Sequence, residues 1–428
     1  MRRRFLISIL ISDLIALGLA MGVASVFVFD TPWFWAADVA NGQSLWPMAG
    51  LLGGGAVAAA YASARMWARS VPRPTYGRAV AIIAMSLTVT SVGLVFARDA
   101  YYSRSFLGVT AAVWLAGSLA HRVVRRRRPW TERMVIITAE KGLAEDLADA
   151  PHTEVLGVLD PASMPPSEPI HDGVLTIDLR SVLSDPMAQF VSSCNMAGIA
   201  VRSMNNVYEE HTGRLPMVHL VEGWEVAAPV SRRVDYMGLK RIFDGLLVLV
   251  TLPIWGMVGG LIWLAVKMDS EGPAIYKQRR IGRGGRRFTL YKFRTMVMDA
   301  ERHGPQFTAE LDERLTSVGR VLRRFRIDEI PQLWNVLKGD LSLVGPRPER
   351  PVFVERFAES IPFYSYRHLV RPGVTGWAQV NYGYADDVAD TVEKLTYDLY
   401  YLKHMSPWLD LNILGRSVWT VLSGFGAQ

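Results

Sequence analysis

The chain has 428 residues, a length that predicts two or three domains rather than one. Apolar residues make up 50% and charged residues 20%, which excludes a disordered or low-complexity chain. A single cysteine, Cys194, excludes a disulfide framework and a cysteine-cluster metal site. The net charge of +7 indicates anionic partners, and the mean hydropathy of +0.16 raises the question of where the apolar residues lie.

Four long apolar runs occupy the first part of the chain. They cover residues 5–29, 46–64, 79–97 and 105–120. A bilayer core needs about 20 such residues per helix, so a four-helix transmembrane bundle is expected over residues 1–128. The first run is longer than the core of a typical signal peptide and three more follow it, which favours a membrane anchor. Its only charged residue is Asp13.

Arginines in the loops predict the orientation of this bundle. Three precede the first run (Arg2–Arg4), four lie in 65–78, and five follow the last run (Arg122 and Arg125–Arg128), against none in 30–45 and two in 98–104. By the positive-inside rule both ends of the bundle are cytoplasmic, and the rest of the chain begins on that side. A functional patch at Arg125–Arg128 is the alternative, but topology and lipid headgroup contacts explain these arginines more simply.

Residues 129–230 are predicted to form a cytoplasmic, Rossmann-like α/β domain. Short apolar strands are expected at 134–138, 155–160, 173–179 and 199–204, with helices between them at 142–149 and 182–196. This alternation predicts a small, mostly parallel sheet. A dinucleotide site needs several glycines after the first strand, and the turn there contains Gly142 alone. Our hypothesis is a domain for regulation or assembly that binds no nucleotide.

A further apolar run at 242–266 is predicted to be a re-entrant membrane helix. Basic residues flank it on both sides, and Pro253 near its centre removes a backbone donor and favours a break. Asp244 could pair with Arg241 at the interface rather than cross the apolar core. An ordinary kinked span is the alternative. A re-entrant helix would leave residues 231–428, the predicted catalytic α/β domain, in the cytoplasm.

The segment 272–298 contains eight basic residues and no Asp or Glu. Its sequences AIYKQRR and RFTLYKFRTM predict two strands joined by IGRGG, which more often closes a hairpin than cradles a phosphate. Lys292 and Arg294 are two residues apart, so on a strand they share one face and could grip a pyrophosphate.

Two adjacent acids, Asp328 and Glu329, are the strongest candidates for chemistry. They precede Pro331, which suits the first turn of a helix, so helix capping is the simplest alternative. However, they follow several arginines, and rigid Pro/Gly loops present Arg347 and Arg371 farther on. Arginines can bind phosphate oxygens while one acid holds a metal ion and the other attacks phosphorus.

The remaining patterns are less specific. The eight histidines lack the spacing of a zinc site. Aromatic residues near the C-terminus could line a membrane-interface surface or pack in a core: Tyr397, Tyr400, Tyr401, Trp408 and Trp419.

Residues 235–422 resemble the bacterial sugar transferase family, the monotopic phosphoglycosyl transferases. The matching sequences are KRIFD, the proline-broken apolar helix, GPAIYKQRRIG, YKFRTM, RIDEIPQLWNVLKGDLSLVGPRP and RPGVTGWAQVN. By architecture, the N-terminal bundle and α/β domain resemble the long form of the family, the polyprenyl glycosylphosphotransferases of exopolysaccharide and O-antigen synthesis. One departure is small: Ile327 stands where leucine is common.

The resemblance implies transfer of a sugar-1-phosphate from a nucleoside diphosphate sugar, a UDP-hexose, to undecaprenyl phosphate at the bacterial inner membrane. It implies that Asp328 is the nucleophile, that Glu329 helps to hold Mg²⁺, and that four basic residues bind phosphates: Lys292, Arg294, Arg347 and Arg371. Membrane lipids are expected partners and nucleic acid is not, while homo-oligomerisation is left open.

Two other functions stay open at this stage. Asp328 could act as a general base for direct transfer in a ternary complex, or the chain could be a non-catalytic membrane sensor or assembly scaffold. A transporter is disfavoured because the four spans contain one internal acid. The sugar would be read by 299–315 or by residues after 382, and no side-chain rule decides which sugar it is.

Overall fold

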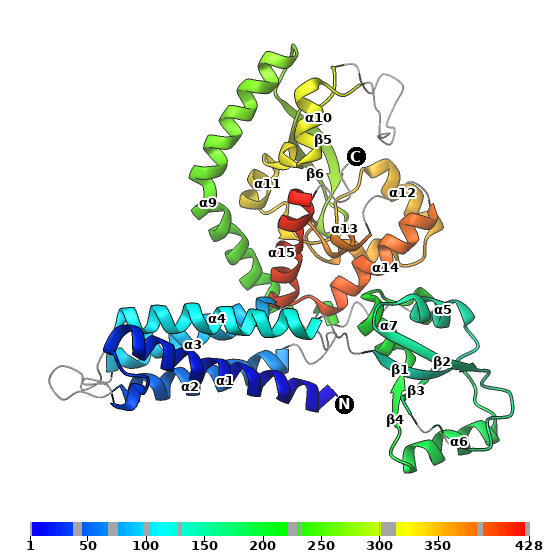
Figure 1. Ribbon diagram of the computed structural model, residues 1–428. Coiled ribbons are helices and arrows are strands. Elements are labelled where there is room, and N and C mark those ends of the chain that lie inside the picture. Colours follow the sequence, from blue (N-terminus) through cyan, green and yellow to red (C-terminus); the bar gives the residue numbers. More distant parts are fainter. Residues whose placement is uncertain are drawn as a thin grey trace.

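The computed structural model describes residues 2–36, 45–66, 76–96, 103–126, 131–168, 170, 172–220, 229–231, 233–298, 300, 314–382 and 388–423. They form a helical bundle, an α/β domain and a C-terminal domain (Figure 1). Most of the predicted sugar-reading stretch 299–315 lies outside the described residues, as do Arg127 and Arg128.

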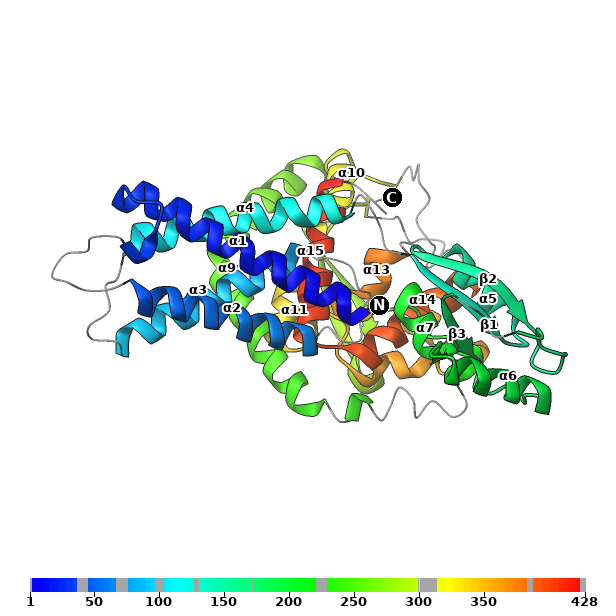
Figure 2. The same ribbon diagram turned by 60° about the horizontal axis from the view of Figure 1, so that its bottom comes forward.

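The bundle contains four helices: α1 (Arg2–Phe29), α2 (Trp46–Met66), α3 (Tyr76–Phe96) and α4 (Arg104–Arg126). Helix α1 packs against α4, and α2 against α3. The start of α1 and the end of α4 lie at the end of the bundle that faces the other two domains (Figures 1 and 2). This arrangement agrees with the predicted placement of both bundle ends on one side.

Four helices of the described chain are long and apolar enough to cross a membrane. Three belong to the bundle, over Leu10–Phe29, Gly77–Leu94 and Arg104–Val124, and the fourth is the long helix Val234–Asp269. The run predicted at 46–64 does form helix α2, but it is not among the four. Its sequence contains four glycines as well as Trp46 and Pro47, which lower the mean hydropathy.

The one acid inside the predicted spans has a buried partner. Arg122 of α4 donates two hydrogen bonds of 2.7 Å to the two carboxylate oxygens of Asp13 in α1, and Trp114 donates to the Asp13 carbonyl. Both charged side chains are buried. A paired charge of this kind joins two helices where apolar packing alone would leave their rotation loose.

The α/β domain contains the four predicted strands: β1 (Glu132–Ile137), β2 (Thr153–Leu159), β3 (Val174–Ile177) and β4 (Ala200–Ser203). All neighbouring pairs are parallel, in the order β2-β1-β3-β4. The predicted parallel sheet is therefore confirmed. Its description as Rossmann-like and its lack of a nucleotide stay predictions.

Helices cover both faces of this sheet. Helices α5 (Lys141–Asp149) and α7 (Met204–Thr212) pack on one face, and α6 (Asp185–Met196) packs on the other, where Cys194 is buried. Helix α6 starts three residues later than the predicted 182, because the side chain of Ser184 accepts a hydrogen bond from the Met187 amide and caps the helix there.

Helix α9 (Val234–Asp269) is one continuous helix of 36 residues, so the break predicted at Pro253 does not interrupt it. Figure 1 shows it bowed around one side of the C-terminal domain and running across the direction of the bundle helices. Buried residues of its first half, such as Val248, and of its second half, such as Ile262, both pack on the C-terminal domain. Most of its other apolar side chains are exposed.

The C-terminal domain begins with the predicted hairpin of β5 (Ile275–Ile281) and β6 (Arg287–Phe293), which pair antiparallel across a turn at Arg283–Gly285. Its helices are α10 (Ser317–Arg324), α11 (Gln332–Lys338), α12 (Pro351–Ser360), α13 (Trp377–Asn381), α14 (Val388–His404) and α15 (Pro407–Ser423). Tyr400 and Tyr401 of α14 are buried in its core and Tyr397 packs against that core, so the core alternative holds for these three aromatics.

Two loops that the sequence presents as stiffened by Pro and Gly pair with each other. Strands β7 (Ser342–Val344) and β8 (Gly373–Thr375) form a short parallel sheet. Their backbones approach so closely that a Cβ on Gly373 would lie 2.1 Å from the Gly345 nitrogen, and one on Gly345 would lie 2.5 Å from the Arg371 carbonyl oxygen. Only glycine fits at these two positions, and the contact fixes the loop that carries Arg347.

Candidate functional site

The acidic pair lies in a short 3-10 turn between α10 and α11. The turn covers Ile327–Glu329, and Pro331 is the N-cap residue of α11, one position before the first helical turn in which the sequence places it. Arg326, just before the turn, has a φ of 51°, a left-handed conformation that is uncommon for a residue with a side chain. This sharp change of direction ends α10 and points the acids into the domain.

Helix α10 lies in close contact with the backbone of Thr295, just after strand β6. A Cβ on Gly319 would lie 2.1 Å from the Thr295 carbonyl oxygen, so only glycine allows the approach. Arg323 of the same helix then donates a hydrogen bond of 3.0 Å from Nε to Thr295 Oγ1. A basic side chain is thereby fixed beside the acidic pair.

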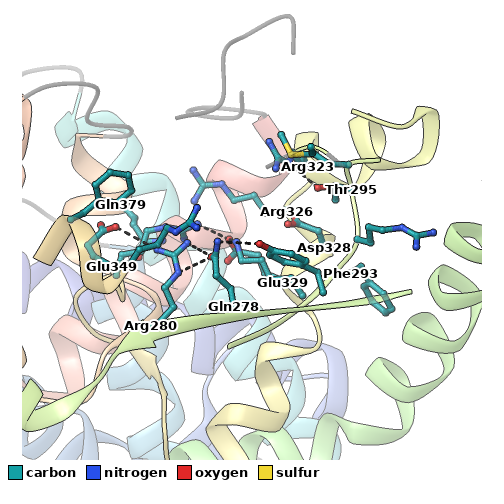
Figure 3. Close-up of a pocket in the computed structure, with 18 of the residues that line it drawn as sticks. Gln278, Arg280, Phe293, Thr295, Arg323, Arg326, Asp328, Glu329, Glu349 and Gln379 are labelled. Atoms are coloured by element: carbon teal, nitrogen blue, oxygen red, sulfur yellow. Dashed lines mark hydrogen bonds and ion pairs between the residues drawn. The ribbon is translucent and has the colours of Figure 1, made fainter. Parts of the chain in front are cut away.

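A cavity of about 370 Å³ surrounds the acidic pair. Four acidic side chains line it, at Asp328, Glu329, Glu349 and Asp398, together with ten basic ones: Arg280, Lys292, Arg294, Arg314, Arg323, Arg326, Arg347, Arg350, Arg367 and Lys394. In Figure 3, Asp328 lies on the same side of the cavity as Thr295 and Arg323, and Gln379 and Glu349 lie on the opposite side. The excess of basic side chains suits a ligand with several negative charges.

Glu329 is held by two of the predicted phosphate-binding residues. Its Oε1 accepts hydrogen bonds from Arg347 at 2.9 Å and from Lys292 Nζ at 3.3 Å. Burial alone would raise the pKa of Glu329, but these two cations reverse the effect and hold the pKa well below its usual range. Glu329 is therefore ionised and fixed in direction.

Asp328 differs from its neighbour. It is buried, at 7% exposed, and no described residue donates a hydrogen bond to its carboxylate. Burial raises its pKa, with a further increase from Glu329, while the nearby Lys292, Arg323 and Arg347 oppose the increase. A carboxylate with open lone pairs amid cations can bind a metal or attack an electrophile that carries negative charge.

Arg294 lines the same cavity, but its guanidinium is already bonded. Its NH2 group donates to the carbonyl oxygen of Ser270 at 2.7 Å and to the Ser270 hydroxyl at 2.8 Å. These bonds tie the end of β6 to the segment that follows α9. The predicted phosphate contact of Arg294 stays a prediction.

The structure places Arg371 away from the acidic pair. It lines a second, small cavity beside Arg241 and Asp244, and its Nε donates to the Gly339 carbonyl at 3.1 Å. Arg241 donates to the carbonyls of Val336 and Leu337. Both arginines thus bind the C-terminal end of α11, the helix whose N-terminal end follows the acidic pair. The predicted phosphate-binding role of Arg371 remains untested.

Comparison with known proteins gives the family of this domain. Residues 235–424 match the family model described as bacterial sugar transferase. A UDP-glucose:undecaprenyl-phosphate glucose-1-phosphate transferase of Caulobacter vibrioides is 39% identical over 188 residues, which cover 43% of this chain and 70% of that relative. The chain belongs to the bacterial sugar transferase family.

Two longer relatives match this chain over a smaller share of their own length. A UDP-N-acetylgalactosamine-undecaprenyl-phosphate N-acetylgalactosaminephosphotransferase of Aeromonas hydrophila is 43% identical over 262 residues, 60% of each chain. A UDP-glucose:undecaprenyl-phosphate glucose-1-phosphate transferase of Xanthomonas campestris pv. campestris is 37% identical over 214 residues, 49% of this chain and 43% of the relative. The chain thus matches about half of the length of these two curated relatives.

The end of the transferase cavity opposite Asp328 is built around Glu349, which the sequence does not single out. Glu349 lies 2.9 Å from Lys394, 3.5 Å from Arg280 and 3.9 Å from Arg367. Burial would raise its pKa, but the three cations lower the pKa to about 2. Glu349 is visible in the sequence as part of PRPERP, whereas Lys394 belongs to an ordinary amphipathic helix and carries no motif.

Among the described residues no cluster of three or more His, Cys, Asp or Glu could hold a metal ion by protein ligands alone. Magnesium at a phosphate site is commonly held by one or two carboxylates, with phosphate oxygens and water completing the shell. Asp328 and the second oxygen of Glu329, Oε2, accept no hydrogen bond from any described residue. The acidic pair of the transferase therefore fits Mg²⁺ held together with a phosphate ligand.

Proposed function

We propose that this chain transfers a sugar-1-phosphate from a nucleoside diphosphate sugar to a polyprenyl phosphate and releases a nucleoside monophosphate. The observation that carries the proposal is the unbonded carboxylate of Asp328 in a cavity lined by ten basic side chains. The relatives' names give uridine diphosphate sugars as donors and undecaprenyl phosphate as acceptor. We infer the same classes here, with a UDP-hexose as the donor.

The reaction proceeds in two displacements at phosphorus. An oxygen of Asp328 attacks the phosphorus that bears the sugar, the bond from that phosphorus to the bridging oxygen breaks, and the nucleoside monophosphate leaves with the electron pair. An oxygen of the polyprenyl phosphate then attacks the same phosphorus and releases the Asp328 carboxylate. A covalent intermediate lets a water-soluble donor and a lipid acceptor use one site in turn.

The basic residues would stabilise the charge on the transferred group. Lys292 and Arg347 hold Glu329 and also lie within electrostatic reach of Asp328, as does Arg323. Donors that are fixed before the reaction stabilise developing charge without reorganisation. Since the cations favour the ionised carboxylate, they also keep Asp328 available as a nucleophile despite its burial.

Magnesium would be held by Glu329, through Oε2, and by the donor phosphates. When bound, Mg²⁺ would neutralise the negative charge of the phosphates, which otherwise repels the attacking carboxylate. Lys292 and Arg347 fix Glu329 through its other oxygen, Oε1, so the metal-facing oxygen is oriented in advance.

The re-entrant placement of α9 is part of this proposal. Asp244 near its start accepts hydrogen bonds from the Ser342 hydroxyl at 2.5 Å and the Leu343 amide at 3.3 Å, and Asp269 at its end accepts from the Val318 amide. A helix that crossed a bilayer would carry its two ends to opposite sides, yet both ends contact one polar domain. With its exposed apolar face in the cytoplasmic leaflet of the inner membrane, α9 would fix the cavity at the depth of the acceptor phosphate.

The reaction is tested by reconstituting the full chain with undecaprenyl phosphate and Mg²⁺ and measuring nucleoside monophosphate release across UDP-glucose, UDP-galactose, UDP-N-acetylgalactosamine, GDP-mannose and ADP-glucose. We expect continued, multiple-turnover UMP release that depends on the acceptor with at least one uridine donor. If none of these donors releases a nucleoside monophosphate, the proposed reaction is wrong and a non-catalytic membrane scaffold is favoured.

A further inference from the structure

The α/β domain contacts the transferase domain through polar residues at the end of α7 and through Leu215, Leu220 and Val230, which are buried in the transferase core. Glu209 of α7 is buried, at 5% exposed, and both its oxygens are bonded across the junction. Lys403 donates to one oxygen at 2.7 Å, and His404 Nε2 lies 2.7 Å from the other. Burial would raise the pKa of Glu209, but His404 and Lys403 lower it, so the carboxylate is ionised and paired.

Arg214, just after α7, forms a second connection. Its guanidinium donates to Glu393 of α14 at 3.0 Å and lies 3.3 Å from Asp146 of α5. The same group lies over the rings of Tyr208 and Tyr397, at 5.8 Å and 5.9 Å from their centroids. Arg214 therefore joins the α/β domain to α14 by ion pairs and by ring contacts at once.

The backbone on both sides of Arg214 is also bound to the transferase domain. Trp377 of α13 donates from Nε1 to the Gly213 carbonyl at 2.8 Å, and the Leu215 amide donates to the Thr396 carbonyl at 3.1 Å. Gly213 has a φ of +67°, and a Cβ there would lie 3.0 Å from the Trp377 ring. The position thus requires glycine for both its conformation and its contact.

Helix α14 carries this junction on one face and the transferase cavity on another. The junction face contains Glu393, Tyr397, Tyr400 and His404, and the cavity face contains Thr391, Lys394, Leu395 and Asp398. Each set repeats at three or four residues, the spacing of a single helix face. A shift or rotation of α14 at the junction must therefore move the cavity wall.

Helix α13 also contacts the α/β domain and lines the cavity, at two positions that are only two residues apart. Trp377 contacts Gly213 and stacks on Tyr400, with ring centroids 5.7 Å apart. Two residues later, Gln379 lines the cavity at the end opposite Asp328 (Figure 3). The cavity end built from Lys394, Asp398 and Gln379 thus lies directly behind the surface that the α/β domain covers.

We propose that the α/β domain holds α13 and α14 in the arrangement that shapes the end of the cavity built from Lys394, Asp398 and Gln379, that this end contributes to donor binding, and that Glu209 and Arg214 are positioning residues for it. The proposal rests on the transfer reaction proposed above. It assigns the α/β domain a task that requires no ligand of its own. Because Asp328 lies at the other end of the cavity, loosening the junction weakens donor binding more than it slows the chemical step.

Charge reversal at one pair of the junction tests this role. In the full chain, Glu209→Lys places a cation beside Lys403 and His404, and Lys403→Glu places a carboxylate beside Glu209. Each single variant should raise the donor KM by about 5-fold or more with kcat much less changed, and the double variant should return KM toward the wild-type value. Asp172→Lys and Arg133→Glu make the same charge changes at an exposed pair of the α/β domain and should leave KM unchanged.

Hydrogen–deuterium exchange of the segment 388–404 gives a second measurement that needs no substrate. Exchange in α14 should be faster in each single variant and near wild type in the double variant. If a charge reversal does not fold, Glu209→Gln keeps the shape and removes the charge, and it should show a smaller change in the same direction.

The outcomes separate this inference from the proposed reaction. An unchanged donor KM in the single variants, or a double variant no better than either single one, would overturn the positioning role while transfer by the wild type continues. If the wild type transfers nothing, the reaction is wrong, and unchanged exchange in α14 would then also remove the structural part of the inference.

Discussion

Two clusters of buried charge in this chain, one after strand β3 and one in the turn between α10 and α11, differ in how their acids are bonded. In the α/β domain, Asp178 follows β3 and accepts hydrogen bonds from Thr138 Oγ1 at 3.2 Å and from the Arg180 amide at 3.0 Å, with His219 Nε2 3.4 Å away. In the transferase cavity, Asp328 is equally buried but accepts no hydrogen bond from the described residues.

The comparison separates an acid whose oxygens are hydrogen-bonded from an acid whose oxygens are available for the proposed reaction. Removing a carboxylate from water is unfavourable in free energy, and hydrogen bonds from neighbouring donors offset this for Asp178. Asp328 has only the electrostatic field of nearby cations, which leaves its lone pairs available for the proposed attack on phosphorus. Acidic residues next to arginines are therefore informative about function only when their hydrogen bonds are also known.

The largest expected effect is the loss of transfer in Asp328→Asn. An amide cannot attack phosphorus to form the acyl phosphate, so the rate should fall by at least about 10³-fold. UMP release in the presence of undecaprenyl phosphate measures this directly. Asp340→Asn is the matched control, since Asp340 is partly exposed beyond the other end of α11 and should tolerate the change.

Lys292→Ala and Arg347→Ala should each reduce kcat/KM for the donor by about 10²-fold. Each change removes a cation from Glu329 and from the field around Asp328. Arg287→Ala is the control, because Arg287 forms an exposed ion pair with Glu355. Activity near the wild-type level in both cavity variants would contradict the assignment of these residues.

The acid limb of the pH profile should shift in a defined direction. The pKa of Asp328 is raised by burial, so kcat/KM should fall as pH decreases through a value above the usual range of aspartate. Arg347 lowers this pKa, and its replacement by alanine should therefore move the limb to higher pH. A limb that stays in place in Arg347→Ala would show that another group controls it.

The smallest effect on activity is expected from Asp178→Ala in the α/β domain. Removal of the carboxylate leaves the buried Thr138 hydroxyl and the Arg180 amide without their acceptor, which should cost about 1–3 kcal/mol of stability. Thermal unfolding of the full chain should begin at lower temperature while kcat stays near wild type. A selective loss of kcat without loss of stability would place Asp178 among the functional residues.

Local patterns in the sequence predict much of this fold. Apolar runs mark the long helices, alternation of strands and helices marks the parallel sheet, and Pro331 marks the start of the helix after the acidic pair. The acids and their two closest cations, Lys292 and Arg347, are also found in this way, because each lies in a distinctive motif.

Contacts between distant segments could not be predicted. Asp13 and Arg122 are 109 residues apart and pair only because α1 and α4 pack together. Arg371 resembles Arg347 in its Pro/Gly context, yet the pairing of β7 with β8 directs it to the end of α11. Lys394 reaches the cavity because α14 folds back beside it, which its helical sequence does not reveal.

The most direct test of the central claim is to incubate the full chain with Mg²⁺ and a labelled UDP-sugar that supports transfer, in the absence of polyprenyl phosphate. Mass spectrometry of the digested protein should find one phosphosugar on the peptide that contains Asp328, with UMP released in equal amount, and no adduct in Asp328→Asn. Transfer by the wild type without any such adduct would contradict the account and favour direct transfer with Asp328 as a general base.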